Sequence, residues 1–173
     1  MADIKLDIQD NIFLRIERNF DLTQFVDGDI KVVLHLNQSE ILLNETQFIY
    51  FVDQFITILN SVLEKNEKSI YIGSQDIAYE YIEFLKGSSK ETNIEWKTFI
   101  DCQVMNAVGY AGFIYCSSNN FYIQISKLDA TLLELKKESS NYLFNNPQKL
   151  LLTSVSEDIL QNWLLQLKKL RNI

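Results

Sequence analysis

Hydrophobic and polar residues alternate along the first part of the chain in the manner of half-buried β-strands. Two short runs, 4–8 and 12–16, place aliphatic residues at every second position and are separated by an Asp-Asn pair that favours a turn. A third alternating run, 30–36, follows Asp27-Gly28, a pair that favours a tight turn because glycine reaches positive φ at little cost. The pattern predicts three strands in this region.

The strongest helical pattern runs from about residue 45 to residue 65. Apolar residues recur there at spacings of three and four, which places them on one face of a helix with mostly polar residues opposite. The apolar face consists of Phe48, Ile49, Val52, Phe55, Ile56, Leu59, Val62 and Leu63. Asn44 is a suitable N-cap, with Gln47 three residues later as in a capping box. We expect a central helix that packs on one face of a sheet.

A second helix is predicted over residues 157–170. Ser156 is a favourable N-cap, acidic residues occupy the first turn and basic residues the last, so both ends complement the helix dipole. Its apolar face consists of Ile159, Leu160, Trp163, Leu164, Leu167 and Leu170. This segment therefore has both the periodicity and the end signals of a helix.

The pattern between the two helices is mixed. Residues 75–86 show helical spacing, although alternating tyrosines there leave a strand open. Strand patterns return over 94–104, and 113–117 and 121–126 flank a Ser-Asn-Asn turn as in a hairpin. A short run at 150–152 predicts one more strand. We expect an antiparallel meander in this part of the chain.

Together these elements predict one α+β domain over residues 1–173, with a mainly antiparallel sheet packed by the two helices. A chain of this length buries roughly 70 % of the surface that it exposes when unfolded, which is enough for one core. Local hairpin signals, rather than repeated βαβ spacing, argue against a doubly wound parallel sheet. The sequence shows no internal repeat and no linker rich in Pro, Gly or Ser.

The net charge of −7 is unevenly distributed along the chain. Residues 1–130 hold 10 basic and 19 acidic side chains, or −9, whereas residues 131–173 hold 6 basic and 4 acidic ones, or +2. Nucleic-acid binding draws much of its affinity from Lys and Arg at phosphates, so an acidic chain without a basic stripe does not fit that class. The charge favours a basic protein partner; the alternative is that it only keeps the protein soluble.

Few residues have the types and spacing that catalysis or metal binding requires. His35 is the only histidine, which rules out sites with two histidine ligands, and it is expected on the second face of its strand. Cys102 and Cys116 are expected to be reduced core residues. The close pair Gly109 and Gly112 lacks a following lysine and is interpreted as a turn or bulge. We therefore expect no enzyme activity, no metal site and no cofactor.

The sequence also favours a cytoplasmic protein. Its N-terminus lacks the basic start and apolar run of a secretion signal, and polar residues interrupt its richest apolar segment, 48–63. We therefore expect no membrane partner.

These properties favour a small acidic binding protein, of the immunity or inhibitor kind, that neutralises a basic toxin such as a nuclease by direct contact. The alternative is a non-catalytic regulatory or adaptor module of bacterial or phage origin, which would share the same composition. Tyr79, Glu80 and Glu83 place an aromatic ring among carboxylates on one predicted helical face, so they are the candidate partner-binding residues. The oligomeric state is left open.

Overall fold

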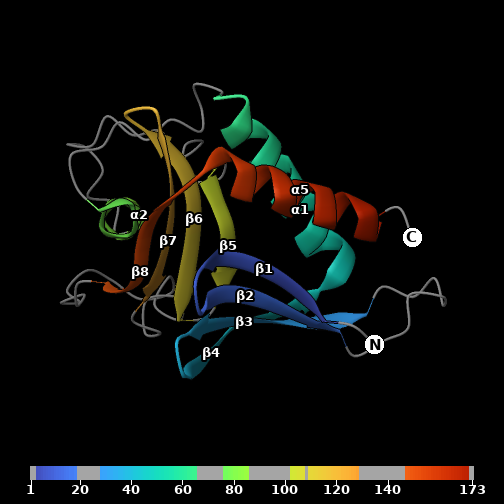
Figure 1. Ribbon diagram of the computed structural model, residues 1–173. Helices are drawn as coiled ribbons and strands as arrows, with labels where there is room; N and C mark the ends of the chain where they lie inside the picture. Colours follow the sequence, from blue (N-terminus) through green and yellow to red (C-terminus); the bar gives the residue numbers. More distant parts are fainter. Residues whose placement is uncertain are drawn as a thin grey trace.

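The computed structural model describes residues 3–18, 28–65, 76–85, 102–107, 109–128 and 147–171, the last three residues of α2 and residues 106 and 107 by their backbone alone. It contains two four-stranded antiparallel sheets (Figure 1). The first sheet consists of β1 (Ile4–Gln9), β2 (Ile12–Arg18), β3 (Asp29–Leu36) and β4 (Ser39–Gln47). The second consists of β5 (Gln103–Ala107), β6 (Tyr110–Ser117), β7 (Asn120–Lys127) and β8 (Gln148–Val155). Within each sheet, each strand pairs with the next one along the chain, so the expected α+β class with antiparallel strand pairing is confirmed, with the strands divided between two sheets.

The first three strands of the first sheet follow directly from their alternating sequences. Asn11 (φ 59°) and Asn37 (φ 55°) turn the chain at the ends of β1 and β3, in a conformation that asparagine adopts more readily than most residues. The inward residues of the first three strands form part of the main core: Ile4, Leu6, Ile8, Leu14, Ile16, Ile30, Val32 and Leu34. Their neighbours carry the charges of the outer face, where Arg15 lies between Glu17 and Glu40.

The second sheet is buried on both faces. On one side, Ile114, Cys116, Ile123 and Ile125 join the main core that also contains the first sheet. On the other side, Ala111, Phe113 and Tyr115 join a smaller core that contains α2 (Ile77–Leu85). Figure 1 shows this arrangement, with α2 on one side of the sheet and α1 and α5 on the other. Ser118 and Asn119, both at positive φ, make the tight turn of the predicted β6–β7 hairpin.

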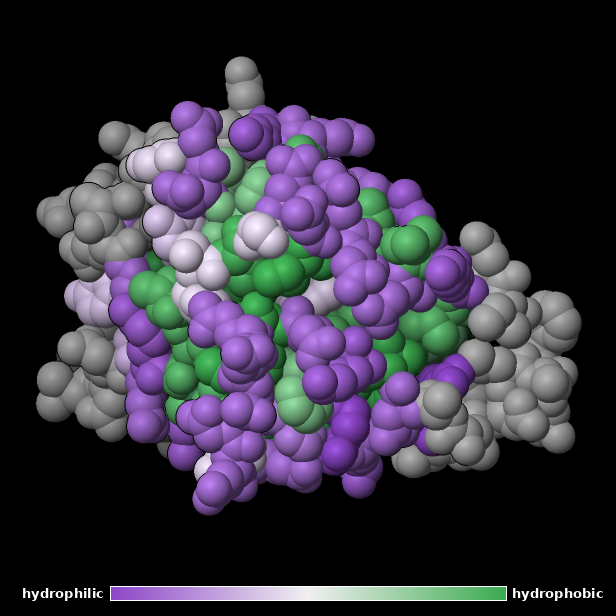
Figure 2. Space-filling view, in the orientation of Figure 1, coloured by the Kyte–Doolittle hydropathy of each residue, from purple (hydrophilic) through white to green (hydrophobic). Residues whose placement is uncertain are grey.

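Two helices, α1 (Phe48–Leu63) and α5 (Glu157–Arg171), pack against each other. Strands of both sheets contact α1, and β1 contacts α5. At their contact, the rings of Phe55 and Trp163 meet edge to face with centroids 6.0 Å apart. Farther along, Nε of Arg171 lies 2.6 Å from Oδ1 of Asp53. Figure 2 shows apolar surface in the middle of this side of the molecule, surrounded by hydrophilic residues.

The two halves of the described chain repeat one topology. Each half is a four-stranded meander in sequence order, followed at once by a long helix: β1 to β4 with α1, and β5 to β8 with α5. The sequence shows no repeat that would indicate this similarity. The two helices share one core, in which α1 contacts β4, β5 and β6 and α5 contacts α1 and β1.

The predicted start of the first helix is wrong. Asn44 is not its N-cap but lies inside β4, which continues to Gln47 because Gln47 pairs with Asp29 at the edge of β3. Gln47 is the N-cap and makes no capping bond with its side chain. The helix signals at α5 are confirmed, since Ser156 Oγ accepts a hydrogen bond from the Ile159 N–H at 3.4 Å.

The segment left open between helix and strand is a helix, α2. Several other predictions lie outside the described residues, namely the turn residue Asp27 and most of the strand over 94–104. The strand predicted at 150–152 is part of the longer β8. Within the described ranges, no helix is long and apolar enough to cross a membrane.

Candidate functional site

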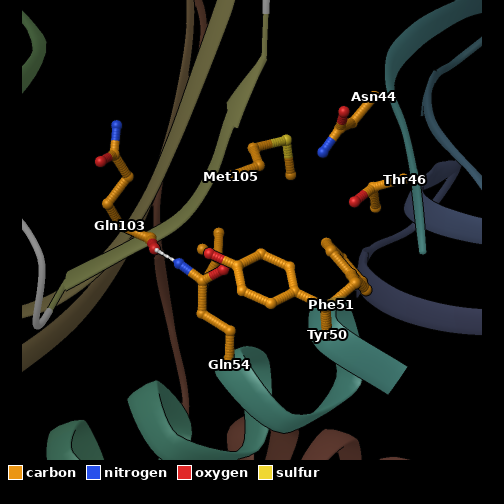
Figure 3. A pocket seen from close by; sticks show the side chains of 8 residues that line it. Asn44, Thr46, Tyr50, Phe51, Gln54, Gln103 and Met105 are labelled. Atoms are coloured by element: carbon orange, nitrogen blue, oxygen red, sulfur yellow. Dashed lines mark hydrogen bonds between the residues drawn. The ribbon is translucent and has the colours of Figure 1, made fainter. Parts of the chain in front are cut away.

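A groove of about 420 Å³ lies where the edges of the two sheets approach each other beside the first turns of α1. We call it the edge groove. Figure 3 shows the side chains of Asn44 and Thr46 on one side and of Met105 on the other, with the rings of Tyr50 and Phe51 below. Its lining residues are Asn44, Thr46, Tyr50, Phe51, Gln54, Gln103, Val104 and Met105.

The wall formed by β4 depends on an irregularity in the strand. Val32 pairs with Asn44 whereas the next residue, Val33, pairs with Leu42, so Leu43 is an extra residue. Leu43 is buried in the main core. Asn44 and Thr46 pair with inward residues of β3, so their own side chains also point inward. Polar side chains at inward positions contribute little to hydrophobic packing. Their presence here indicates a binding site rather than a part of the core.

The floor joins α1 to β5. Nε2 of Gln54 donates a hydrogen bond of 3.1 Å to the backbone carbonyl of Gln103. In Figure 3 the side chain of Gln103 points away from the groove, so only its backbone faces Gln54. Tyr50 is 65 % exposed, so much of its ring is in contact with solvent next to the buried Phe51.

The opposite wall requires a glycine in the neighbouring strand. Gly112 pairs with Met105, and a Cβ atom added at Gly112 would lie 2.8 Å from Cγ of Met105. Atoms at that separation overlap, so any larger residue would force Met105 into another rotamer. Gly112 thus sets the position of the Met105 thioether in the groove. The predicted turn is found at Gly109, which has a positive φ of 94°, whereas Gly112 lies inside β6.

Changing Gly112 to alanine is expected to displace Met105 and to lower the free energy of unfolding by about 1 to 3 kcal/mol, the usual cost of overpacking. The displacement should appear as a shift of the Met105 methyl resonance in a carbon-correlated NMR spectrum, and the destabilisation in a urea titration. Ala111→Gly, on the opposite face of the same strand, serves as the control because it should leave the Met105 resonance in place. An unchanged Met105 resonance in Gly112→Ala would contradict the close approach.

The chemistry of the edge groove is that of a site for an uncharged ligand. All of its lining side chains are neutral. The amide of Asn44 and the hydroxyl of Thr46 are half-buried and make no hydrogen bond to another described residue. They offer donors and acceptors beside the apolar atoms of Phe51, Val104 and Met105, an arrangement typical of ligand sites.

A second cluster of polar side chains lies at the start of α2, around Asp76. Oδ1 of Asp76 accepts hydrogen bonds from the backbone N–H of Ala78 (3.0 Å) and from Nε2 of the fully buried Gln124, and Oδ2 lies 2.9 Å from Nζ of Lys149. Burial raises the pKa of Asp76, but the hydrogen bonds from Lys149, Gln124 and the backbone and the charge of Lys149 outweigh it, so the pKa lies below 3.8. Asp76 therefore holds α2 on the second sheet as a carboxylate.

Tyr115 lies in the same small core. Burial, together with the nearby negative charge of Asp76, raises the pKa of its hydroxyl well above the ordinary value of 10.0. The phenol therefore stays protonated at neutral pH, which fits a packing role.

The residues predicted to bind a partner are not all at the surface. Tyr79 is half-buried, and Glu80 is only 5 % exposed, so the expectation of an exposed carboxylate at Glu80 is wrong. The reason is that α2 is buried around most of its circumference: five of its six described side chains, residues 77 to 82, are buried. The side chain of Glu83 lies outside the described part of the chain. A binding role for Tyr79, Glu80 and Glu83 stays a prediction.

His35 and the cysteines have structural surroundings. His35 lies on the second face of β3, as expected, but it is only 9 % exposed, since its ring stacks on Phe13 with centroids 4.1 Å apart. Its Nε2 lies 3.2 Å from Oε1 of Glu40. Cys102 and Cys116 are buried free thiols, as predicted.

Among the described residues, no three His, Cys, Asp or Glu side chains cluster in a way that could hold a metal ion. The edge groove is the candidate site because polar and apolar side chains, all neutral, line one cavity. No protein-family model matches the chain, and no significant match was found to a curated protein or to a solved structure.

Proposed function

We propose that this protein is a non-catalytic, cytoplasmic binding protein of the immunity or inhibitor kind, which neutralises a basic protein such as a toxin by direct contact. The observation that carries the proposal is the acidic charge of the segment that supplies most of the groove lining. Residues 28–65, which supply β3, β4 and α1, hold five acidic and two basic side chains, or −3. Residues 147–171, which supply β8 and α5, hold four basic and two acidic ones, or +2.

An uneven charge of this kind speeds association with a partner of opposite charge. Complementary potentials raise association rates over those of neutral pairs and disfavour partners of like charge. Near the groove, Asp29 and Glu45 are both exposed, and Glu45 lies between the two groove residues of β4. They are therefore the carboxylates with which a basic partner would interact first.

The test begins with capture of a partner from an extract of the native host and its identification by mass spectrometry, and continues with stopped-flow measurement of association. The double variant Asp29→Lys, Glu45→Lys is expected to associate about tenfold more slowly at low ionic strength, and the difference should shrink at high salt because screening shortens to about 8 Å at physiological ionic strength. The control Lys168→Glu changes an exposed residue of α5, and this variant should associate with the partner no more slowly than the parent protein. An acidic partner, or an association rate indifferent to both salt and the reversals, would rule out the proposal.

A further inference from the structure

We infer that the edge groove binds an extended segment of a partner protein, which adds alongside β4 as a further strand and places an uncharged apolar side chain in the groove. The inference rests on the proposed function only in assuming that the ligand belongs to a protein. It goes beyond that proposal because it assigns a site, a backbone conformation and a side-chain class to the contact.

The backbone part of the inference comes from the position of β4. This nine-residue strand is the last in the order of its sheet and pairs with β3 alone among the described strands. None of the described strands pairs with its other edge, and two of its residues, Asn44 and Thr46, line the groove. An unpaired strand edge of this length is the feature to which extended peptides add in β-augmentation.

The side-chain part comes from the lining. A peptide strand directs every second side chain to the same face, so one side chain of the added strand would project toward Met105 and Phe51. Met105 is a flexible thioether that adapts to differently shaped apolar groups. Asn44 and Thr46 stand beside it with unused donors and acceptors, which suit the amide groups of a peptide.

The charge of the groove argues against a nucleic acid as the occupant. None of the lining residues is Lys or Arg, and the flanking residues 28–65 carry a net charge of −3. Phosphates need several cationic contacts, which this surface does not offer. A neutral backbone meets no such requirement.

The probe for the test is a terminally blocked, fluorescently labelled heptapeptide of sequence Lys-Thr-Val-Leu-Val-Thr-Lys, with binding measured by fluorescence anisotropy. Two further peptides carry N-methyl groups on one or the other alternating set of amides. Because a single edge pairs with only one set, methylation of that set is expected to weaken binding at least tenfold while methylation of the other changes it less than threefold. A peptide with Asp in place of the central Leu should bind at least tenfold more weakly.

Two protein variants provide a matched pair. Thr46→Trp fills the groove, whereas Leu42→Trp places the same side chain on the opposite face of the same strand, at an exposed and uncharged position. We expect at least tenfold weaker peptide binding by Thr46→Trp and less than twofold change for Leu42→Trp. Thermal melting of both variants checks that each is folded, and the methylated peptides test the inference without any change in the protein.

The outcomes separate this inference from the proposed function. No binding of the probe, equal effects of the two methylated peptides, or full binding by folded Thr46→Trp would overturn strand addition at the groove. A variant of the probe with Glu at both ends tests the charge alone. If this variant binds as well as the Lys-ended probe while N-methylation and Thr46→Trp still weaken binding as expected, strand addition is supported and the preference for a basic partner is wrong.

Discussion

Replacing Trp163 by alanine is expected to lower the free energy of unfolding by about 3 to 5 kcal/mol, and replacing Phe55 by alanine to have an effect of similar size. Both side chains are fully buried and their rings contact each other at the junction of α1 and α5. Trp163 has a further role, because its Nε1 donates a 2.8 Å hydrogen bond to the backbone carbonyl of Asp7. Its loss therefore leaves a cavity and removes a tie between α5 and β1.

Urea or thermal unfolding measures this effect. Leu165→Ala is the matched control, since Leu165 lies on the same helix but is 53 % exposed, and it should change stability by no more than about 0.5 kcal/mol. The double variant should lose less than the sum of the two single losses, because the two rings are in contact. Near-native melting of Trp163→Ala would show that the junction of the helices is not part of the core.

The second large effect is expected for Asp76→Ala, which should lower the free energy of unfolding by about 1 to 3 kcal/mol. The change removes the N-cap acceptor of α2 and deprives Gln124 of a buried hydrogen-bond partner. Looser packing of the smaller core, which contains Tyr81, Phe113 and Tyr115, should follow, and a weaker near-ultraviolet circular dichroism of the protein would report it. Asp158→Ala is the control because this exposed residue contacts the solvent at the start of α5.

The contribution of Asp76 should also depend on pH. Its folded pKa lies below the ordinary 3.8, so the stabilisation is fully present well above that value and is lost as the pH falls through the folded pKa. Asp76→Asn keeps a capping oxygen but does not titrate, so the difference in stability between the parent protein and this variant should shrink below about pH 4. A difference that stays constant from pH 6 to pH 2 would contradict the ion pair with Lys149.

Much of the fold follows from local sequence patterns. The β1–β2 and β6–β7 hairpins, the strand β3 and the helix α5 all have unbroken periodicity and suitable turn or cap residues. In contrast, β4 was not predicted. Its bulge at Leu43 interrupts the alternation, and the polar run that follows resembles the start of a helix more than the end of a strand.

The candidate site was missed for the same reason. Asn44 and Thr46 can be recognised as inward polar residues only when β4 is known to be a strand. In addition, the groove is completed by β5, which comes from the other half of the chain. The error at Glu80 has a different cause. Helical periodicity separates a polar from an apolar face, but it does not show that further parts of the chain bury the polar face too.

The ties between β1 and the end of the fold have a consequence for synthesis on the ribosome. Trp163 follows Asp7 by 156 positions, and Thr153, which accepts a hydrogen bond from Gln9, follows that residue by 144. At about 5 to 20 residues per second, on the order of 8 to 30 s separate the translation of β1 from that of α5. During this interval the nascent first sheet lacks the helix that covers part of its apolar face, so we expect newly made chains to be most prone to associate with one another before α5 is made.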